Sequence, residues 1–97
     1  MEVSILGGFE WDPDKSKSNQ AKHGVNFDAA IVIWHDSRRV SFDSTIVSGE
    51  PRQLTIGKIG EKIYTAMTTP RGDNTRIISV RRARDQEVRF YDRRNNS

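Results

Sequence analysis

The pattern of apolar and polar positions predicts mainly strands in the second half of this chain. Four consecutive segments either alternate apolar with polar residues or hold β-branched runs, as strands do. They cover Val40 to Phe42, residues 52–57, residues 63–69 and residues 75–80. Turn-like connections separate these segments, and strands joined in this way favour an antiparallel meander.

The segment at residues 75–80 is the one around which the rest is organised. Ile77 and Ile78 are adjacent, so they point to opposite faces, and a strand that is apolar on both faces is usually central. Arg76 and Arg81 lie near its two ends, five residues apart, which also directs them to opposite faces. A β-bulge or a strand end must realign one of them if they are to share a face. Otherwise both are ordinary arginines whose tips reach solvent.

Two helices are predicted before these strands, after a short strand at residues 9–11. Asp12 is a good helix N-cap residue, and Pro13 suits the first turn. Gly24 is placed to end this helix after His23 in a left-handed conformation. Few apolar residues lie on the helix, which indicates a surface position.

The second helix is predicted over residues 27–35, with Asn26 as its N-cap. Its apolar positions have the i, i+3, i+4, i+7 spacing of one helical face, at Phe27, Ala30, Ile31 and Trp34. A last helix is predicted over residues 85–93. The fold class is therefore α+β: an antiparallel β-sheet meander with two N-terminal helices packed on it and a C-terminal helix.

Ninety-seven residues suffice for a single domain with a modest core. We expect that domain at residues 9–93, with an N-terminal extension at 1–8 and a C-terminal tail at 94–97. The chain has no cysteine, which excludes disulfides and fits a reducing compartment. No apolar run approaches the roughly 20 residues of a membrane span, and residues 1–8 lack the pattern of a signal peptide. These features predict a cytoplasmic protein.

The positive charge of the chain is concentrated at its C-terminal end. From residue 71 onward there are eight arginines and four acids, whereas residues 1–70 hold eight Lys and Arg and nine acids. Arginine is always charged and grips phosphate through two N–H groups at once. This asymmetry indicates a polyanionic or acidic partner for the C-terminal third. A solvated basic face without a partner gives the same pattern.

Three separated motifs resemble those of the BrnT toxins. The motifs are F-E-W-D-P-x-K from Phe9, K-H-G-V-x-F from Lys22, and R-I-I-S-x-R-R-A-x-x-x-E from Arg76, with a late tyrosine at Tyr91. They stand in the family's order, and the resemblance covers roughly residues 9–91. It implies a RelE-like fold, ribonuclease activity, and a place as the toxin half of a bacterial type II toxin–antitoxin pair. It also implies a BrnA-type antitoxin, a DNA-binding partner whose complex with the toxin represses the operon.

This chain departs from the family pattern at several positions. Many members carry E-R-W where this chain has Pro51-Arg52-Gln53, so Arg52 is kept while its neighbours differ. A glutamate often found before the turn arginine is Pro70 here. Members often have a threonine at the position of Arg84, and its absence breaks the capping box with Glu87. We expect a weaker last helix as a result.

The chemistry of RNA cleavage selects the candidate site residues. Attack of the 2′-OH on the adjacent phosphate needs a base, an acid for the leaving oxygen, and positive charge, which arginine and lysine supply without a metal. We expect four arginines to converge on one face of the sheet and hold phosphate: Arg52, Arg71, Arg76 and Arg81, with Arg82 as substitute if Arg81 points away. Lys22 and His23 end a helix together, and His23 is a possible general acid or base.

Each remaining candidate has a structural alternative. His23 is equally a helix-end residue that bonds a terminal carbonyl. Tyr91 either stacks on a base of single-stranded RNA or packs in the core beside Val88. Two histidines without cysteine predict no metal site and no cofactor.

Two functions remain open at the level of the sequence. One is a metal-independent endoribonuclease toxin that stops translation. The other is a non-catalytic basic module that docks an antitoxin or nucleic acid without cleaving it.

Overall fold

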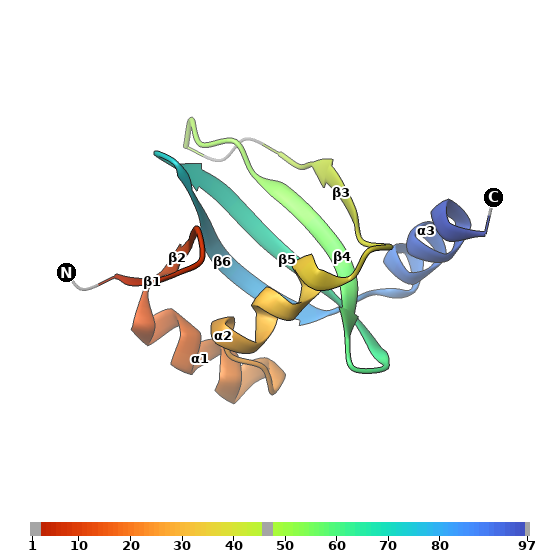
Figure 1. The fold of residues 1–97 in the computed structure, drawn as a ribbon, viewed down its shortest axis with the longest axis horizontal. Helices are drawn as coiled ribbons and strands as arrows, with labels where there is room; N and C mark the ends of the chain where they lie inside the picture. Colours follow the sequence, from red (N-terminus) through yellow and green to blue (C-terminus); the bar gives the residue numbers. More distant parts are fainter. Residues whose placement is uncertain (1–2, 46–47, 97) are drawn as a thin grey trace.

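The computed structural model describes residues 3–45 and 48–96, and within them it shows one six-stranded sheet with three α-helices and a 3₁₀ helix (Figure 1). The strands are β1 (Ser4–Leu6), β2 (Phe9–Trp11), β3 (Val40–Asp43), β4 (Gln53–Ile59), β5 (Lys62–Arg71) and β6 (Asn74–Arg82). The helices are α1 (Pro13–His23), α2 (Phe27–Ala30), the 3₁₀ helix η1 (Ile31–His35) and α3 (Asp85–Asn95). Parts of the expected extension (1–2), loop (46–47) and tail (97) lie outside the described residues. Nowhere in the described ranges is a helix long and apolar enough to span a membrane.

The order of the strands in the sheet is β1-β2-β6-β5-β4-β3. The predicted meander is confirmed, because β3, β4, β5 and β6 pair in sequence and antiparallel. The prediction of a wholly antiparallel sheet is wrong, since β2 runs parallel to β6, with Glu10 opposite Arg76. The chain passes through α1, α2 and η1 between β2 and the meander, and that long connection sets the direction in which β2 meets β6. A three-residue strand carries no sequence signal for its direction.

The first helix begins and ends as its sequence predicts. The Asp12 carboxylate accepts a hydrogen bond from the Asp14 amide at 2.9 Å, and Gly24 adopts a left-handed conformation with φ 74°. The helix is fastened to the sheet by polar groups. Asn19 is buried, donates to the carbonyls of Val25 and Val80 at 2.8 Å each, and accepts from the Val80 amide at 3.2 Å. One amide side chain therefore joins α1, the chain that follows it, and β6.

The predicted second helix is correct in place but not in form. Asn26 caps it, with its side chain accepting from the Ala29 amide at 2.8 Å. After Ala30 the chain tightens into the 3₁₀ helix η1, which has three residues per turn. The fully buried residues are therefore Phe27, Ala30 and Ile33, three apart, whereas Ile31 and Trp34 are half-buried. The expected two N-terminal helices are thus one regular helix and one short α-to-3₁₀ segment.

A glycine in β4 lets η1 lie close to the sheet. A Cβ atom on Gly57 would lie 2.9 Å from Cγ2 of Ile33 and 3.0 Å from its carbonyl oxygen, closer than such atoms approach. Without that side chain the 3₁₀ helix rests directly on β4, and Ile33 fills the space.

The strand β6 contains a β-bulge. Met67 of β5 pairs with Ser79, and the next residue, Thr68, pairs with Ile77, so Ile78 is an extra residue on β6. Ile77 and Val80 consequently point to the same face although they are three apart, and both are buried in the core beneath α1 and α2. The central position predicted for this strand is confirmed, because β6 lies between β2 and β5.

The two faces of the sheet are covered differently. The helices α1, α2 and η1 lie on one face, against Ala66, Ile77 and Val80. The helix α3 lies on the other face, near β3 and β4 and away from α1 (Figure 1). There the ring of Phe90 meets that of Phe42 edge to face, with 5.4 Å between centroids. We call the face without α1 and α2 the arginine face, because Arg76 and Arg81 point to it.

A broken capping box was predicted at the N-terminus of α3, and the structure shows that one of its two hydrogen bonds, the one to Glu87, is present. Arginine has no acceptor, so the Arg84 side chain cannot cap the helix. The Glu87 carboxylate nevertheless accepts from the Arg84 amide at 2.8 Å. The helix runs to Asn95, two residues beyond its predicted end at residue 93.

The attachment of α1 through Asn19 can be tested by substitution. We expect Asn19→Ala to lower the free energy of unfolding by about 3 kcal/mol, because it leaves the buried carbonyls and amide that Asn19 serves without partners. Urea denaturation measures this change. The control is Ser18→Ala, an exposed neighbour on the same helix, which should stay within about 0.5 kcal/mol of the unsubstituted protein. Equal stability of the two variants would show that the Asn19 bonds are dispensable.

Candidate active site on the arginine face

The bulge in β6 brings arginines from both ends of the strand to one face. Residues opposite each other in a ladder point to the same side. Arg81 lies opposite Thr65, Ser79 opposite Met67, and Arg76 opposite Thr69. Because one residue is inserted between the two arginines, they share a face despite their odd spacing. The sequence required a β-bulge or a strand end to bring Arg76 and Arg81 to one face, and the bulge in β6 does this.

Arg76 is held by a carboxylate from the parallel strand β2. Its Nη1 donates to Oε2 of Glu10 at 2.9 Å, and Asn74 donates to the other oxygen, Oε1, at 3.2 Å. The side chains of Arg76 and Glu10 are 18% and 14% exposed, so solvent screens this pair only partly. The guanidinium keeps N–H groups that this contact does not use.

Arg81 is held more completely, by Glu87 at the start of α3. Its two terminal nitrogens donate to the two oxygens of Glu87, at 2.6 and 2.9 Å. The same carboxylate accepts from the Thr65 hydroxyl at 3.0 Å and from the Arg84 amide. Partial burial raises the pKa of Glu87, but these hydrogen bonds and the charge of Arg81 outweigh it and lower the pKa to about 2. The hydrogen bond from Glu87 likewise raises the pKa of Arg81.

Arg52 has no such partner in the described part of the chain. Its Nη1 lies 3.5 Å from the sulfur of Met67, a weak acceptor, and its Nε is buried without a hydrogen bond. Met67 points to the arginine face, so Arg52 reaches over that face from the chain before β4. A buried guanidinium N–H without an acceptor is costly, and an anion would relieve that cost.

Arg71 lies on the same face at the turn between β5 and β6, opposite Asn74. It forms an ion pair with Glu50 at 2.8 Å, and the two side chains are 45% and 38% exposed. Such an exposed pair is screened by solvent and contributes little to stability. Arg71 is therefore free to exchange its partner.

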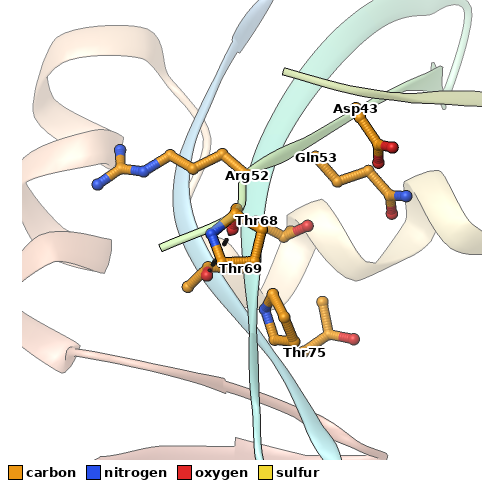
Figure 2. Close-up of a pocket in the computed structure, with 8 residues that line it drawn as sticks. Asp43, Arg52, Gln53, Thr68, Thr69 and Thr75 are labelled. Atoms are coloured by element: carbon orange, nitrogen blue, oxygen red, sulfur yellow. Dashed lines mark hydrogen bonds between the residues drawn. The ribbon is translucent and has the colours of Figure 1, made fainter. Parts of the chain in front are cut away.

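A cleft of about 260 Å³ lies beside Arg52, where the ends of β3, β4, β5 and β6 meet. It is lined by Asp43, Pro51, Arg52, Gln53, Thr68, Thr69, Pro70 and Thr75. In Figure 2 the guanidinium of Arg52 extends away from the side chains of Asp43 and Gln53. Register places Gln53 and Thr68 opposite each other on the helix-covered face. Thr69 lies opposite Arg76 on the arginine face, and Arg52 contacts Met67 there, so the cleft adjoins the arginine face at these two residues.

A larger hollow of about 490 Å³ borders the arginine face beside α3. Phe42, Ile56 and Phe90 give it an apolar floor, and Gln86, Glu87 and Arg93 line it as well. Glu87 also holds Arg81, so this hollow is continuous with the arginine cluster. Aromatic side chains next to phosphate-binding arginines suit a nucleotide base.

The structure places three of the candidate residues elsewhere. Lys22 and His23 are exposed at the end of α1, in the layer that covers the opposite face. Tyr91 is buried and donates a hydrogen bond from its hydroxyl to Oδ2 of Asp36 at 2.7 Å. Burial and this bond raise the pKa of Tyr91 to about 12. The geometry therefore matches the core alternative for Tyr91.

Two carboxylates on the arginine face, Glu10 and Glu87, were not predicted from the sequence as site residues. Glu10 belongs to the F-E-W-D-P motif and Glu87 to the motif that begins at Arg76, so both lie within the motifs that carry the resemblance. Their pairing with Arg76 and Arg81 depends on the parallel contact of β2 and on the position of α3. A sequence pattern shows neither contact.

Comparison with protein families decides the identity. Residues 11–87 match the family described as the ribonuclease toxin BrnT of type II toxin–antitoxin systems. The chain belongs to the BrnT family. The match includes the four arginines and Glu87, and it supports a ribonuclease toxin with an antitoxin partner. A search of curated proteins finds no match.

In this BrnT family member, the Arg81–Glu87 pair makes a testable contribution to acid stability. A carboxylate whose pKa is depressed by folding stabilises the protein above its unfolded pKa, and this stabilisation is lost as pH falls through the folded pKa. We expect wild type to exceed Glu87→Gln in stability by a constant amount above pH 4.5, and the difference to shrink as pH falls from 4.5 toward about 2.

Urea denaturation at a series of pH values measures this difference. The control is Glu61→Gln, an exposed residue of the β4–β5 turn, whose stability should run parallel to wild type. A constant difference between wild type and Glu87→Gln down to pH 2 would contradict the assigned pairing.

Proposed function

We propose that this protein is a metal-independent endoribonuclease toxin that cleaves RNA on its arginine face and thereby inhibits translation. Membership of the BrnT family supports ribonuclease activity as the class of reaction. The observation that carries the mechanism is the bulge in β6, since it aligns Arg76 and Arg81 on the face that Arg52 also reaches. Positive charge held in place before the substrate arrives stabilises the charge that develops on the phosphorane.

The three arginines have different capacities to bind phosphate. Arg81 donates two bonds to Glu87 and is largely neutralised, whereas Arg76 donates one bond to Glu10. Arg52 forms no ion pair within residues 3–45 and 48–96, and its buried Nε needs an acceptor. We therefore assign the closest phosphate contact to Arg52. Arg76 and Arg81 add oriented positive charge on either side, and Arg71 extends the track at its exposed end.

The hollow beside α3 provides the aromatic contact that Tyr91 cannot make. We propose that a base next to the cleaved phosphate lies against Phe90 and Phe42, while Arg93 contacts the backbone. Lys22 and His23 have no part in this mechanism, because they lie in the layer on the other side of the sheet.

We also propose that a BrnA-type, DNA-binding antitoxin neutralises the toxin. An acidic antitoxin segment on the arginine face would satisfy Arg52 and compete with RNA for the same charges. The excess of arginine in the C-terminal third supports such a contact.

Cleavage in the presence of a chelator tests the proposed reaction. Purified protein incubated with RNA and EDTA should produce fragments with 2′,3′-cyclic phosphate ends. Arg52→Ala should lower the rate about 10- to 100-fold, because it removes a charge-assisted contact worth roughly 1.5–3 kcal/mol. Arg52 is a better target than Arg76 or Arg81, whose removal leaves a half-buried carboxylate unpaired.

Arg82→Ala is the matched control for this test. Arg82 follows Arg81 in β6, but it lies opposite Tyr64 on the other face, with its guanidinium 5.6 Å from the centre of that ring. Its loss removes the same charge and should leave cleavage close to wild type. If RNA is bound but stays intact, the protein is the non-catalytic binding module. If both variants lose activity equally, general charge rather than the arginine face is responsible.

Growth measurements test the toxin–antitoxin relationship. Expression of the chain alone in a bacterium should arrest growth and reduce incorporation of labelled amino acid, because translation stops. Arg52→Ala should relieve the arrest, and co-expression with the adjacent antitoxin gene should restore growth to wild-type toxin. Growth arrest with undiminished amino-acid incorporation would argue against translation as the target.

A further inference from the structure

The proposed cleavage needs a group that accepts the proton of the attacking 2′-OH. Histidine is the usual candidate near neutral pH. His23 lies in the opposite layer, and Tyr91 is buried against Asp36. Among the described residues, three carboxylates pair with arginines of the arginine face. Glu50 pairs with Arg71 in an exposed contact at the strand ends, whereas Glu10 and Glu87 pair with the less exposed Arg76 and Arg81. A base that acts beside the central arginines is therefore sought among the last two.

Glu87 accepts more hydrogen bonds than Glu10 does. Its two oxygens accept from both terminal nitrogens of Arg81, from the Thr65 hydroxyl and from the Arg84 amide. Three of these four bonds end on Oε1 and one ends on Oε2, so Glu87 keeps about one acceptor position, at Oε2. The same contacts lower its basicity. We therefore assign Glu87 a structural role, which is to hold Arg81.

Glu10 has capacity to spare. Each of its oxygens accepts one hydrogen bond, Oε2 from Arg76 and Oε1 from Asn74, which leaves about one acceptor position on each. The side chain is half-buried, with 14% of its surface exposed, and the partner opposite it on the edge strand β1 is the uncharged Ile5. Arg76 is thus the charged group that the structure places against Glu10.

The shared geometry of Glu10 and Arg76 suits a base next to a phosphate ligand. A phosphate oxygen bound by the N–H groups that Arg76 retains places the neighbouring ribose beside the carboxylate. Glu10 and Arg76 are directly opposite in the parallel pairing of β2 and β6, so the backbone fixes their separation. Functional groups held on strands in this way are positioned more rigidly than groups on loops.

We propose that Glu10 is the general base of RNA cleavage in this protein, an assignment that rests on the proposed function. The Glu10 carboxylate takes the proton of the 2′-OH, and the 2′-oxygen forms a bond to phosphorus. The bond from phosphorus to the 5′-oxygen breaks, and that oxygen takes a proton from solvent water. The products are a 2′,3′-cyclic phosphate and a 5′-hydroxyl. Arg76 binds the phosphate that is attacked.

The substitution Glu10→Gln separates the base from a merely positioning residue. Glutamine keeps an oxygen that accepts from Arg76, but it cannot take a proton at neutral pH. We expect cleavage to fall about 100-fold or more, the range of general-base catalysis. Binding of a 2′-O-methyl RNA that cannot be cleaved should not weaken, because a negative charge beside the phosphate has been removed. Glu61→Gln is the control for the same chemical change at an exposed turn.

Chemical rescue provides the second measurement. In Glu10→Ala, added formate should restore part of the cleavage, whereas the same concentration of chloride should not, because only formate replaces the lost carboxylate. Circular dichroism and urea denaturation confirm that each variant is folded. If Glu10→Ala does not fold, Glu10→Asp replaces it, and it should retain RNA binding but cleave more slowly because its carboxylate is set back by one methylene.

The outcomes separate this inference from the function on which it rests. Wild-type cleavage together with unchanged cleavage by Glu10→Gln would overturn the assignment of the base alone. Weakened binding of the 2′-O-methyl RNA together with no rescue by formate would make Glu10 a positioning residue for Arg76. Absence of cleavage by wild type would overturn the proposed function, and the general base with it.

Discussion

The single residue inserted in β6 is the constraint on which the rest of the structure depends. Side chains alternate along a regular strand, so Ile77 and Val80 could not both enter the core, nor Arg76 and Arg81 both leave it, without a bulge. The insertion serves both faces at once. It closes the apolar layer beneath α1 and α2, and it aligns two guanidinium groups on the opposite side. Stability and the candidate site are therefore coupled through one irregularity of the backbone.

The arginine face combines three arginines that form ion pairs, Arg71, Arg76 and Arg81, with Arg52, for which the described residues supply no ion-pair partner. Ion pairs of partly buried groups contribute little net stability, because desolvation offsets the attraction between the charges. Their consequence here is geometric, since Glu10 and Glu87 fix the directions in which Arg76 and Arg81 point. Among the described residues nothing accepts a hydrogen bond from the buried Nε of Arg52, and this unsatisfied donor is a local cost to stability. The anion binding proposed for Arg52 would offset that cost.

The C-terminal helix is joined to the rest of the molecule by polar contacts from its first turn and from its middle. Glu87 bonds Arg81 and Thr65 of the sheet, while Tyr91 bonds Asp36 at the end of η1. Asp36 also accepts from the amides of Arg38 and Lys58, and these bonds lower its pKa although burial raises it. Between these two contacts the ring of Phe90 packs against that of Phe42, and both rings line the apolar hollow. The position of α3 beside the arginines thus depends on a few directional bonds.

Local chemistry in the sequence determined the elements: the caps at Asp12 and Asn26, the left-handed Gly24, and the four strands of the meander all follow from side chains and their immediate neighbours. The tightening to a 3₁₀ helix after Ala30 and the parallel contact of β2 with β6 did not follow, because both result from packing between segments far apart in the chain. The same distinction applies to the site. The sequence identified the arginines by their charge and number. Only the folded sheet showed that Arg52 has no ion-pair partner among the described residues, that Glu10 pairs with Arg76, and that His23 and Tyr91 lie apart from the arginines. Hydrogen-bond partners are assigned by three-dimensional proximity, and residue order does not encode proximity across a sheet.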